Sequence, residues 1–219
     1  MARIEERKRT TGHRQRRPVI YIICEGFETE INYFRKFRTR YSNIDIRPIT
    51  SHHKSAISLI NRVADTLKQE LYYPEDGDQI WCVFDRNGNT NEELQKAGQI
   101  ASRRGYYIAF SNPAFELWFL LHFIDQRAYL TDAEAVITKL DTENCIPNYS
   151  KSGDYYDMLL PMRQQALERA IALQKYHTDN GHNLLHRDSN PCTSIAQLVE
   201  LLQRLAGQTA LLLTESKHS

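Results

Sequence analysis

Long hydrophobic runs are absent from this 219-residue sequence, and no stretch approaches the roughly 18 apolar residues that a membrane span needs. The N-terminus is too polar for a secretory signal, so we expect a cytoplasmic protein without a membrane partner. Cysteine is scarce: Cys24, Cys82, Cys145 and Cys192 are scattered and form no CxxC pair. Cys24 and Cys82 lie in apolar, strand-like runs, which indicates reduced thiols in a core rather than a disulfide framework.

An excess of charge of one sign is also missing. The formal net charge is only +1, which argues against a uniformly basic protein that coats nucleic acid. Residues 1–17 nevertheless hold seven of the 28 Lys and Arg and two of the 27 Asp and Glu, so this segment carries +5 and the rest −4. Two interpretations stay open: a flexible, solvated tail, or an arm that contacts phosphates through Arg14, Arg16 and Arg17.

What the sequence does contain is an alternation of strand-like and helix-like segments up to about residue 124. The expected strands are 19–24, 44–50, 79–85 and 106–111, and the expected helices are 29–41, 55–71, 91–105 and 112–124. In the last helix we place Asn112 at the N-cap and Pro113 at the first helical position. Connections of this length predict right-handed crossovers and a mainly parallel, four-stranded sheet flanked by helices over residues 18–124.

From residue 125 onward the pattern changes to helices, at 131–140, 156–177 and 194–206. Pro161 falls inside the second of these, which predicts a kink or a helix that begins there. The expected organisation is therefore a basic tail over residues 1–17, an α/β domain over 18–124, and a helical region over 125–219 that packs on it.

Polar residues follow three of the expected strands. Glu25 follows the first, Asp85 ends the third, and Asn112 leads to Glu116 after the fourth. Because the carboxyl ends of parallel strands meet at one edge of a sheet, Glu25, Asp85 and Glu116 are expected to converge there. Repulsion among these carboxylates would be relieved by a hard divalent cation, Mg²⁺ or Mn²⁺. The alternative is that these residues cap helices and solvate loops.

The same residues carry a resemblance to a known family. "EGFETEINYF" (25–34), "VFDRNGN" (83–89), "SNPAFELWFLLHF" (111–123) and the late "SNPCTSIAQLVELL" (189–202) are similar to strings in the RloB-like proteins. That family lies within the Toprim superfamily and is linked to AbiL-type abortive-infection phage defence. The resemblance implies a Toprim-like fold, with a glutamate after strand one and a DxD pair after strand three that bind Mg²⁺ for cleavage of nucleic acid.

Carried onto this chain, the resemblance puts Glu25 at the glutamate position and Asp85 at the first aspartate. The second aspartate position is Asn87, which offers a carbonyl oxygen but no charge. Glu116 could supply the missing charge, whereas Glu28 and Glu30 are assigned a supporting role. The general base in Toprim nucleases is usually taken to be the strand-one glutamate, here Glu25.

Other features leave alternatives open. Lys151 and Arg163 are candidates to line a groove for a polyanion, and "NYSKSGDYYD" (148–157) suits base stacking or a joining loop. His177, His182, His186 and Cys192 match no common zinc-site spacing and favour a surface loop. His122, within "LWFLLHF", is expected to be a hydrogen-bonded core residue.

Two functions follow as hypotheses. The first is a metal-dependent Toprim-type nuclease that cleaves DNA or RNA in anti-phage defence. The second is a non-catalytic Toprim-like regulatory or nucleic-acid-binding subunit that works with a partner ATPase encoded nearby, which Asn87 would permit. The sequence leaves the choice between DNA and RNA open, together with the oligomeric state, a homo-oligomer included.

Overall fold

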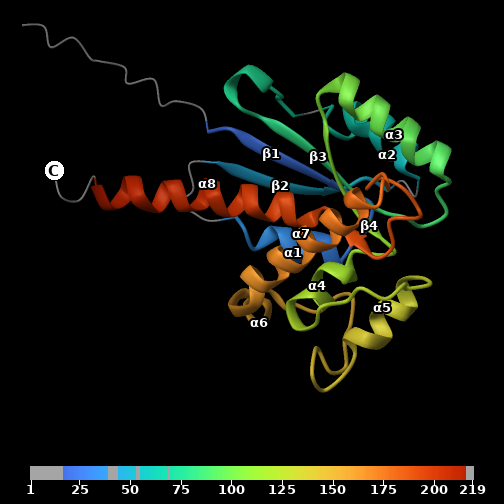
Figure 1. The fold of residues 1–219 in the computed structure, drawn as a ribbon. Helices are drawn as coiled ribbons and strands as arrows, with labels where there is room; N and C mark the ends of the chain where they lie inside the picture. Colours follow the sequence, from blue (N-terminus) through green and yellow to red (C-terminus); the bar gives the residue numbers. More distant parts are fainter. Residues whose placement is uncertain (1–16, 39–43, 53–54, 69, 216–219) are drawn as a thin grey trace, which may run out of the picture.

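A five-stranded sheet forms the centre of the molecule (Figure 1), in a computed structural model that describes residues 17–38, 44–52, 55–68 and 70–215. The strand order is β2-β1-β3-β4-β5, with β1 Val19–Cys24, β2 Asp45–Thr50, β3 Gln79–Asp85, β4 Tyr107–Asn112 and β5 Cys192–Thr193. The first four strands are parallel, as expected, and β5 pairs antiparallel with β4. The fifth strand was not predicted, because two residues are too few to show a strand pattern.

The two faces of the sheet are covered by different helices (Figure 1). Side chains alternate along β1, so Tyr21 and Ile23 pack against α2 (Ala56–Thr66) and α3 (Asn91–Arg104), whereas Ile20 and Ile22 face the other layer. That second layer combines helices from both halves of the chain: α1 Thr29–Arg35, α4 Glu116–Phe123, α5 Ala133–Leu140, α6 Tyr156–Leu159, α7 Arg163–Asp179 and α8 Ile195–Glu215. The region after residue 125 therefore shares a core with the α/β part.

Local sequence signals explain several helix ends. Thr90 and Glu93 form a capping box at the start of α3, and Gly105 ends the helix in a left-handed conformation with φ 70°. Ser55 caps α2 and Asp132 caps α5 through their side chains. Pro161 lies in a 3-10 turn that separates α6 from α7, so the expected break in segment 156–177 is confirmed.

The start of α4 differs from the prediction. Asn112 is the last residue of β4 rather than a helix cap, a cis peptide bond joins it to Pro113, and α4 begins only at Glu116. The side-chain amide of Asn112 lies within 2.9–3.1 Å of backbone carbonyl oxygens in segment 186–189. Asn112 thus fastens the late part of the chain to the end of β4, which is why it is not available as a cap.

Segment 189–191 repeats the Ser-Asn-Pro sequence of 111–113, and its Asn190–Pro191 bond is also cis. The Asn190 amide donates to Asn112 Oδ1 at 3.2 Å and to the Leu130 carbonyl at 2.7 Å. The hydroxyls of Ser111 and Thr193 are 3.0 Å apart across the β4–β5 pair. The two Ser-Asn-Pro segments are therefore bonded to each other beside the carboxyl end of β4.

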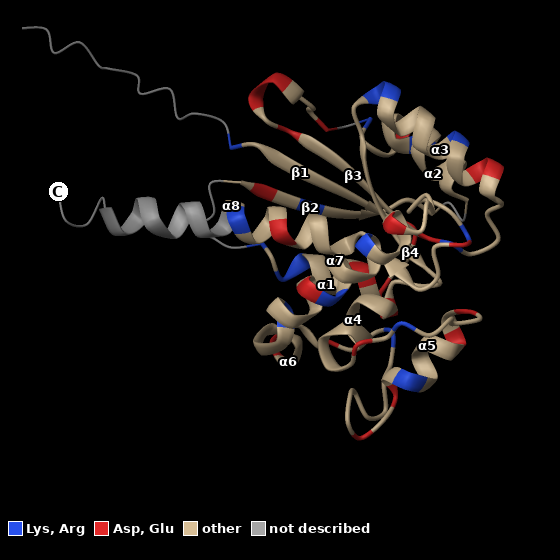
Figure 2. Cartoon of the chain, in the orientation of Figure 1, with Lys and Arg blue, Asp and Glu red and all other residues tan. Residues whose placement is uncertain are grey.

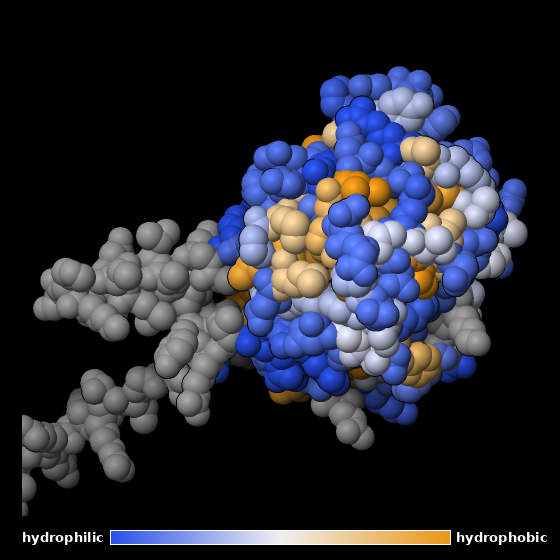
Figure 3. Space-filling view, turned by 90° about the horizontal axis from the view of Figure 1, so that it is seen from below, coloured by the Kyte–Doolittle hydropathy of each residue, from blue (hydrophilic) through white to orange (hydrophobic). Residues whose placement is uncertain are grey.

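The surface shows no broad hydrophobic face in the view from below: Figure 3 is mostly hydrophilic there, with small hydrophobic groups between. Acidic and basic residues are intermingled along the described chain (Figure 2). In the part of the chain that the structure describes, no helix has the length and hydrophobicity required to cross a bilayer.

Candidate functional site

An acidic pocket of about 830 Å³ lies at the carboxyl edge of the sheet, where β1, β3 and β4 end. The edge is the one expected to collect ligands in a parallel α/β protein. Five acidic residues and one lysine contribute to the lining, which consists of Glu25, Gly26, Phe27, Glu28, Thr29, Glu30, Asp85, Asn87, Gly88, Glu116, Ala133 and Lys151. The structure therefore brings the expected site residues Glu25, Asp85, Asn87, Glu116 and Lys151 together.

Glu25 is held by the loop that follows β3. Its backbone N–H donates to the Val83 carbonyl at 2.9 Å, which continues the sheet by one residue. Its side chain accepts hydrogen bonds at both oxygens, from the Asn87 amide at 2.6 Å and from the Asp85 backbone N–H at 3.3 Å. Asn87 has a positive φ of 35° and presents its amide nitrogen, not its carbonyl oxygen, to Glu25. In this arrangement Asn87 orients the glutamate.

Glu116 is fixed on the opposite side of the pocket. It begins α4, only 3% of it is exposed, and its Oε1 accepts from the Tyr149 hydroxyl at 3.1 Å. The Thr29 hydroxyl lies 3.5 Å from the same oxygen, and Lys151 Nζ lies 3.8 Å from it. Burial of α4 against the core thus places a carboxylate at the strand edge and leaves it few ways to move.

Glu30 and Asp85 have strongly altered acidities. Glu30 is 6% exposed, and its carboxylate lies so close over Gly26 that a Cβ at that position would collide with it. Burial, reinforced by the charges of Glu116 and Glu25 and opposed by a hydrogen bond from its own backbone N–H, raises the pKa of Glu30 to about 7. Burial, followed by the charges of Glu30, Glu116 and Glu25, also raises the pKa of Asp85 well above its usual range.

These residues fit a hard divalent cation in donor chemistry. All of the donors are oxygens. Burial, together with the charges of neighbouring carboxylates, raises the pKa of Glu30 and of Asp85, and a bound cation would offset this cost of holding them ionised. No group of three His, Cys, Asp or Glu in the described ranges is arranged to hold an ion as it stands. Ligation through Glu25 Oε1 would require release of its hydrogen bond from the Asn87 amide.

The other basic residues expected at the site lie elsewhere. Arg163 is 4% exposed and its guanidinium packs against the rings of Phe37 and Tyr156. The expectation that it lines a groove for a polyanion is therefore wrong, because the guanidinium is inside the protein. Arg17 precedes β1 and lies at the amino edge of the sheet, the far end from the acidic pocket. Arg14 and Arg16 lie outside the described residues.

Several residues of the site were missed or undervalued in the sequence. Thr29 and Tyr149 bond Glu116 and were not assigned to the site, and Glu30 was given only a supporting role. Tyr149 is one of twelve tyrosines, and no spacing links it to a residue 33 positions earlier. The only available signal was its place in the Tyr-rich segment 148–157, which was considered for base stacking.

The histidine segment is structural. His177 is buried, its Nε2 donates to the Pro191 carbonyl at 2.9 Å, and its Nδ1 lies 3.3 Å from His182 Nδ1. Cys192 lies in β5 and is buried. These contacts tie the segment between α7 and β5 to the helix. The expected surface loop is therefore wrong for His177, which is buried in α7, and for Cys192, which is buried in β5.

The fold and the pocket together define an α/β protein with a carboxylate-rich site at the carboxyl edge of a mainly parallel sheet. A family model described as RloB-like protein matches residues 20–202, and the chain belongs to the RloB-like family. The matched range includes all five strands except Val19, the first residue of β1, and it includes every residue of the acidic pocket. The comparison with curated proteins and the comparison with solved structures each gave no match.

Proposed function

We propose that this protein is a metal-dependent nuclease of Toprim type, which cleaves phosphodiester bonds of DNA or RNA in abortive-infection defence against phage. The observation that carries the proposal is the convergence of Glu25, Glu30, Asp85 and Glu116 in one pocket at the carboxyl edge of the sheet. The Toprim assignment and the defence role rest on the resemblance of the sequence motifs.

The residues of the pocket divide the chemical tasks. Glu25 and Asp85, with Glu30 beside them, would hold Mg²⁺ or Mn²⁺, which when bound stabilises charge on the scissile phosphate. Glu25 directly follows β1 at the carboxyl edge of the sheet, and it is our candidate to accept a proton from the attacking water. Glu116 keeps its place through Tyr149 and Thr29, and Lys151 offers a cation to a phosphate oxygen.

The test is a cleavage assay on labelled single-stranded and double-stranded DNA and RNA with Mn²⁺ and with Mg²⁺. We expect cleavage that depends on the metal, and a loss of about 100-fold or more in Glu25→Gln and in Asp85→Asn, because each removes a charge from the site. Glu75→Gln is the matched control, because Glu75 is exposed in the 3-10 turn Pro74–Asp76, before the amino end of β3. Failure of the natural protein to cut any of these substrates, alone or with an ATPase encoded nearby, would refute the proposed nuclease activity.

A second function is favoured by one observation. Asn87 is neutral and its amide already donates a hydrogen bond to Glu25, so this pair is stable without a cation. A chain of this kind suits a regulatory or nucleic-acid-binding subunit that works with a partner ATPase. It would bind nucleic acid, or the partner, without cleaving.

A further inference from the structure

We propose that Phe27 is a platform on which an unpaired base stacks, so that the acidic pocket takes single-stranded nucleic acid. The inference rests on the proposed function, because it names the substrate class of the same pocket. It is argued from the position of Phe27, from its contact with His52, and from the charges that line the pocket.

Phe27 is an exposed aromatic side chain at the mouth of the site. Its exposure is 59%, and of the large hydrophobic side chains that are exposed in the described ranges it alone lines the acidic pocket. Single exposed apolar residues are common on protein surfaces, so exposure by itself has no meaning. Its place between Gly26 and Glu28, two residues after Glu25, puts an aromatic ring beside the carboxylates.

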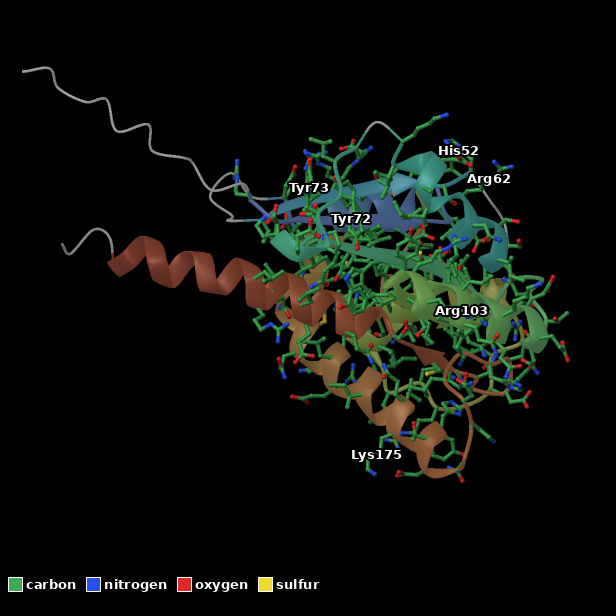
Figure 4. The ribbon with its side chains drawn as sticks, turned by 90° about the horizontal axis from the view of Figure 1, so that it is seen from above. His52, Arg62, Tyr72, Tyr73, Arg103 and Lys175 are labelled. Carbon is green, nitrogen blue, oxygen red and sulfur yellow. The ribbon has the colours of Figure 1, made fainter. Side chains whose placement is uncertain are left out.

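His52 supports the ring from the neighbouring loop. The centroids of Phe27 and His52 are 5.1 Å apart and their planes are inclined at 63°, an edge contact rather than a stack. His52 follows the carboxyl end of β2, with a positive φ of 60°. In Figure 4 it lies at the periphery of the molecule, toward the end of the sheet opposite Tyr73. The two rings are steeply inclined, so His52 is not stacked on Phe27, and Phe27 remains 59% exposed.

The charges of the pocket disfavour a duplex. A protein that binds duplex DNA through its backbones needs several Lys or Arg to neutralise phosphates. Lys151, which is 57% exposed at its side chain, is the single cation among the residues that line this pocket, against five acidic residues. Binding of nucleic acid must therefore rely on a bound divalent metal ion, on one phosphate contact from Lys151 and on stacking of a base. Bases of a duplex are already stacked on each other, whereas an unpaired base has a free face.

The size of the pocket agrees with a nucleotide. Ligand pockets in proteins typically measure about 300–1,000 Å³, and this one is about 830 Å³. Phe27 and Lys151 both belong to its lining, so a base on the former and its phosphate near the latter would share one cavity.

The experiment measures binding separately from cleavage. Fluorescence anisotropy in Ca²⁺ compares a labelled single-stranded oligonucleotide with its duplex, for DNA and for RNA. We expect preference for the single strand, a loss of about 5- to 100-fold in affinity for Phe27→Ala, and retention within about threefold for Phe27→Trp. Tyr129→Ala is the control, because Tyr129 is also exposed, at 66%, but does not line the pocket. Phe27 is exposed, so neither substitution removes core packing.

The outcomes separate this inference from the nuclease. If the natural protein cleaves duplex as well as single strands and Phe27→Ala changes nothing, the stacking role is wrong and the nuclease stands. If nothing is cleaved but single-strand binding falls in Phe27→Ala and survives in Phe27→Trp, stacking stands and the nuclease is wrong. Absence of single-strand binding, or equal losses in the Ala and Trp variants, overturns the inference.

Discussion

Asn87 is the residue at which the two proposed functions differ. Its amide nitrogen is 2.6 Å from Glu25 Oε1, so the pair is a neutral donor and a carboxylate acceptor. An aspartate at this position would place a second negative charge within hydrogen-bonding distance of the first. Like charges this close favour either a proton or a cation between them.

Asn87→Asp should therefore make the stability of the folded protein more dependent on a bound metal ion. We expect a melting temperature below that of the natural protein in EDTA, and a larger increase on addition of Mn²⁺, because the cation binds the folded site and not the unfolded chain. Differential scanning fluorimetry at pH 8, above the pKa of about 7 of Glu30, provides the measurement.

The cleavage assay on the same variant distinguishes the functions. Cleavage that appears in Asn87→Asp and is absent in the natural protein supports the binding subunit. Cleavage already present in the natural protein supports the nuclease. Asn183→Asp adds the same charge in an exposed loop and should leave the response to Mn²⁺ unchanged.

Residue by residue, the sequence predicted which carboxylates meet but not how deep they lie. Glu25 and Asp85 could be found because each stands at the carboxyl end of an apolar strand. The carboxyl ends of parallel strands meet at one edge of a sheet, which predicts that the two residues lie close together. The burial of Glu30 could not be found, because it depends on the fold of the loop over Gly26, which leaves room for that carboxylate. The role of Tyr149 depends on a contact across 33 residues.

At the scale of the elements, α4 contains a histidine whose protonation opposes folding. His122 is 1% exposed, its Nδ1 donates to the Trp118 carbonyl at 2.8 Å, and its Nε2 has no hydrogen-bond partner in the described part of the chain. Burial, with a contribution from the charge of Arg163, lowers the pKa of His122 to about 4. A proton on Nε2 would create a second buried cation near Arg163.

The stability that His122 contributes should depend on pH. Since the folded-state pKa is below the unfolded value of 6.5, the unfolded chain binds the proton first, and stability falls as pH decreases from about 6.5 to about 4. The expected loss over this window is on the order of 3 kcal/mol. Replacement of His122 by Phe, which keeps a ring and cannot titrate, should remove this part of the pH dependence of the unfolding free energy.

Urea denaturation at pH 7 and at pH 4 checks this. The difference in unfolding free energy between the natural protein and His122→Phe isolates the histidine from the carboxylates, which titrate in both. We expect the difference to shift by about 3 kcal/mol in favour of the variant at low pH. An unchanged difference would mean that His122 titrates as it does in the unfolded chain.

Strands could be predicted more closely than helix ends. The runs 19–24 and 79–85 match β1 and β3 residue for residue, because strands buried on both faces are continuously apolar. The helix predicted over 55–71 stops at Thr66, and the reason is visible in its apolar stripe: Leu67 is 7% exposed but Leu71 is 65% exposed. Leu71 matched the helical period without facing the core.

At the scale of the whole molecule, the expected division at residue 124 does not correspond to a division of the core. One cluster of buried residues joins β1 and β3 to α4, α7 and α8, and it contains both tryptophans of the chain, Trp81 and Trp118. Leu198, on α8, belongs to the same cluster and is fully buried. A core shared in this way predicts that the sheet and the C-terminal helices unfold together.

Leu198→Ala tests this cooperativity. The substitution leaves a cavity and should cost about 3 kcal/mol, which corresponds to a fall of about 10 °C in the melting temperature of a protein of this size. Tryptophan fluorescence reports on β3 and α4, and far-UV circular dichroism reports on all helices. We expect both probes to show one transition at the same lowered temperature. Arg204→Ala, at an exposed position of the same helix, should shift it by less than about 2 °C. If the dichroism of Leu198→Ala showed a separate, earlier loss of helix while the fluorescence kept its original midpoint, the C-terminal helices would unfold independently of the sheet.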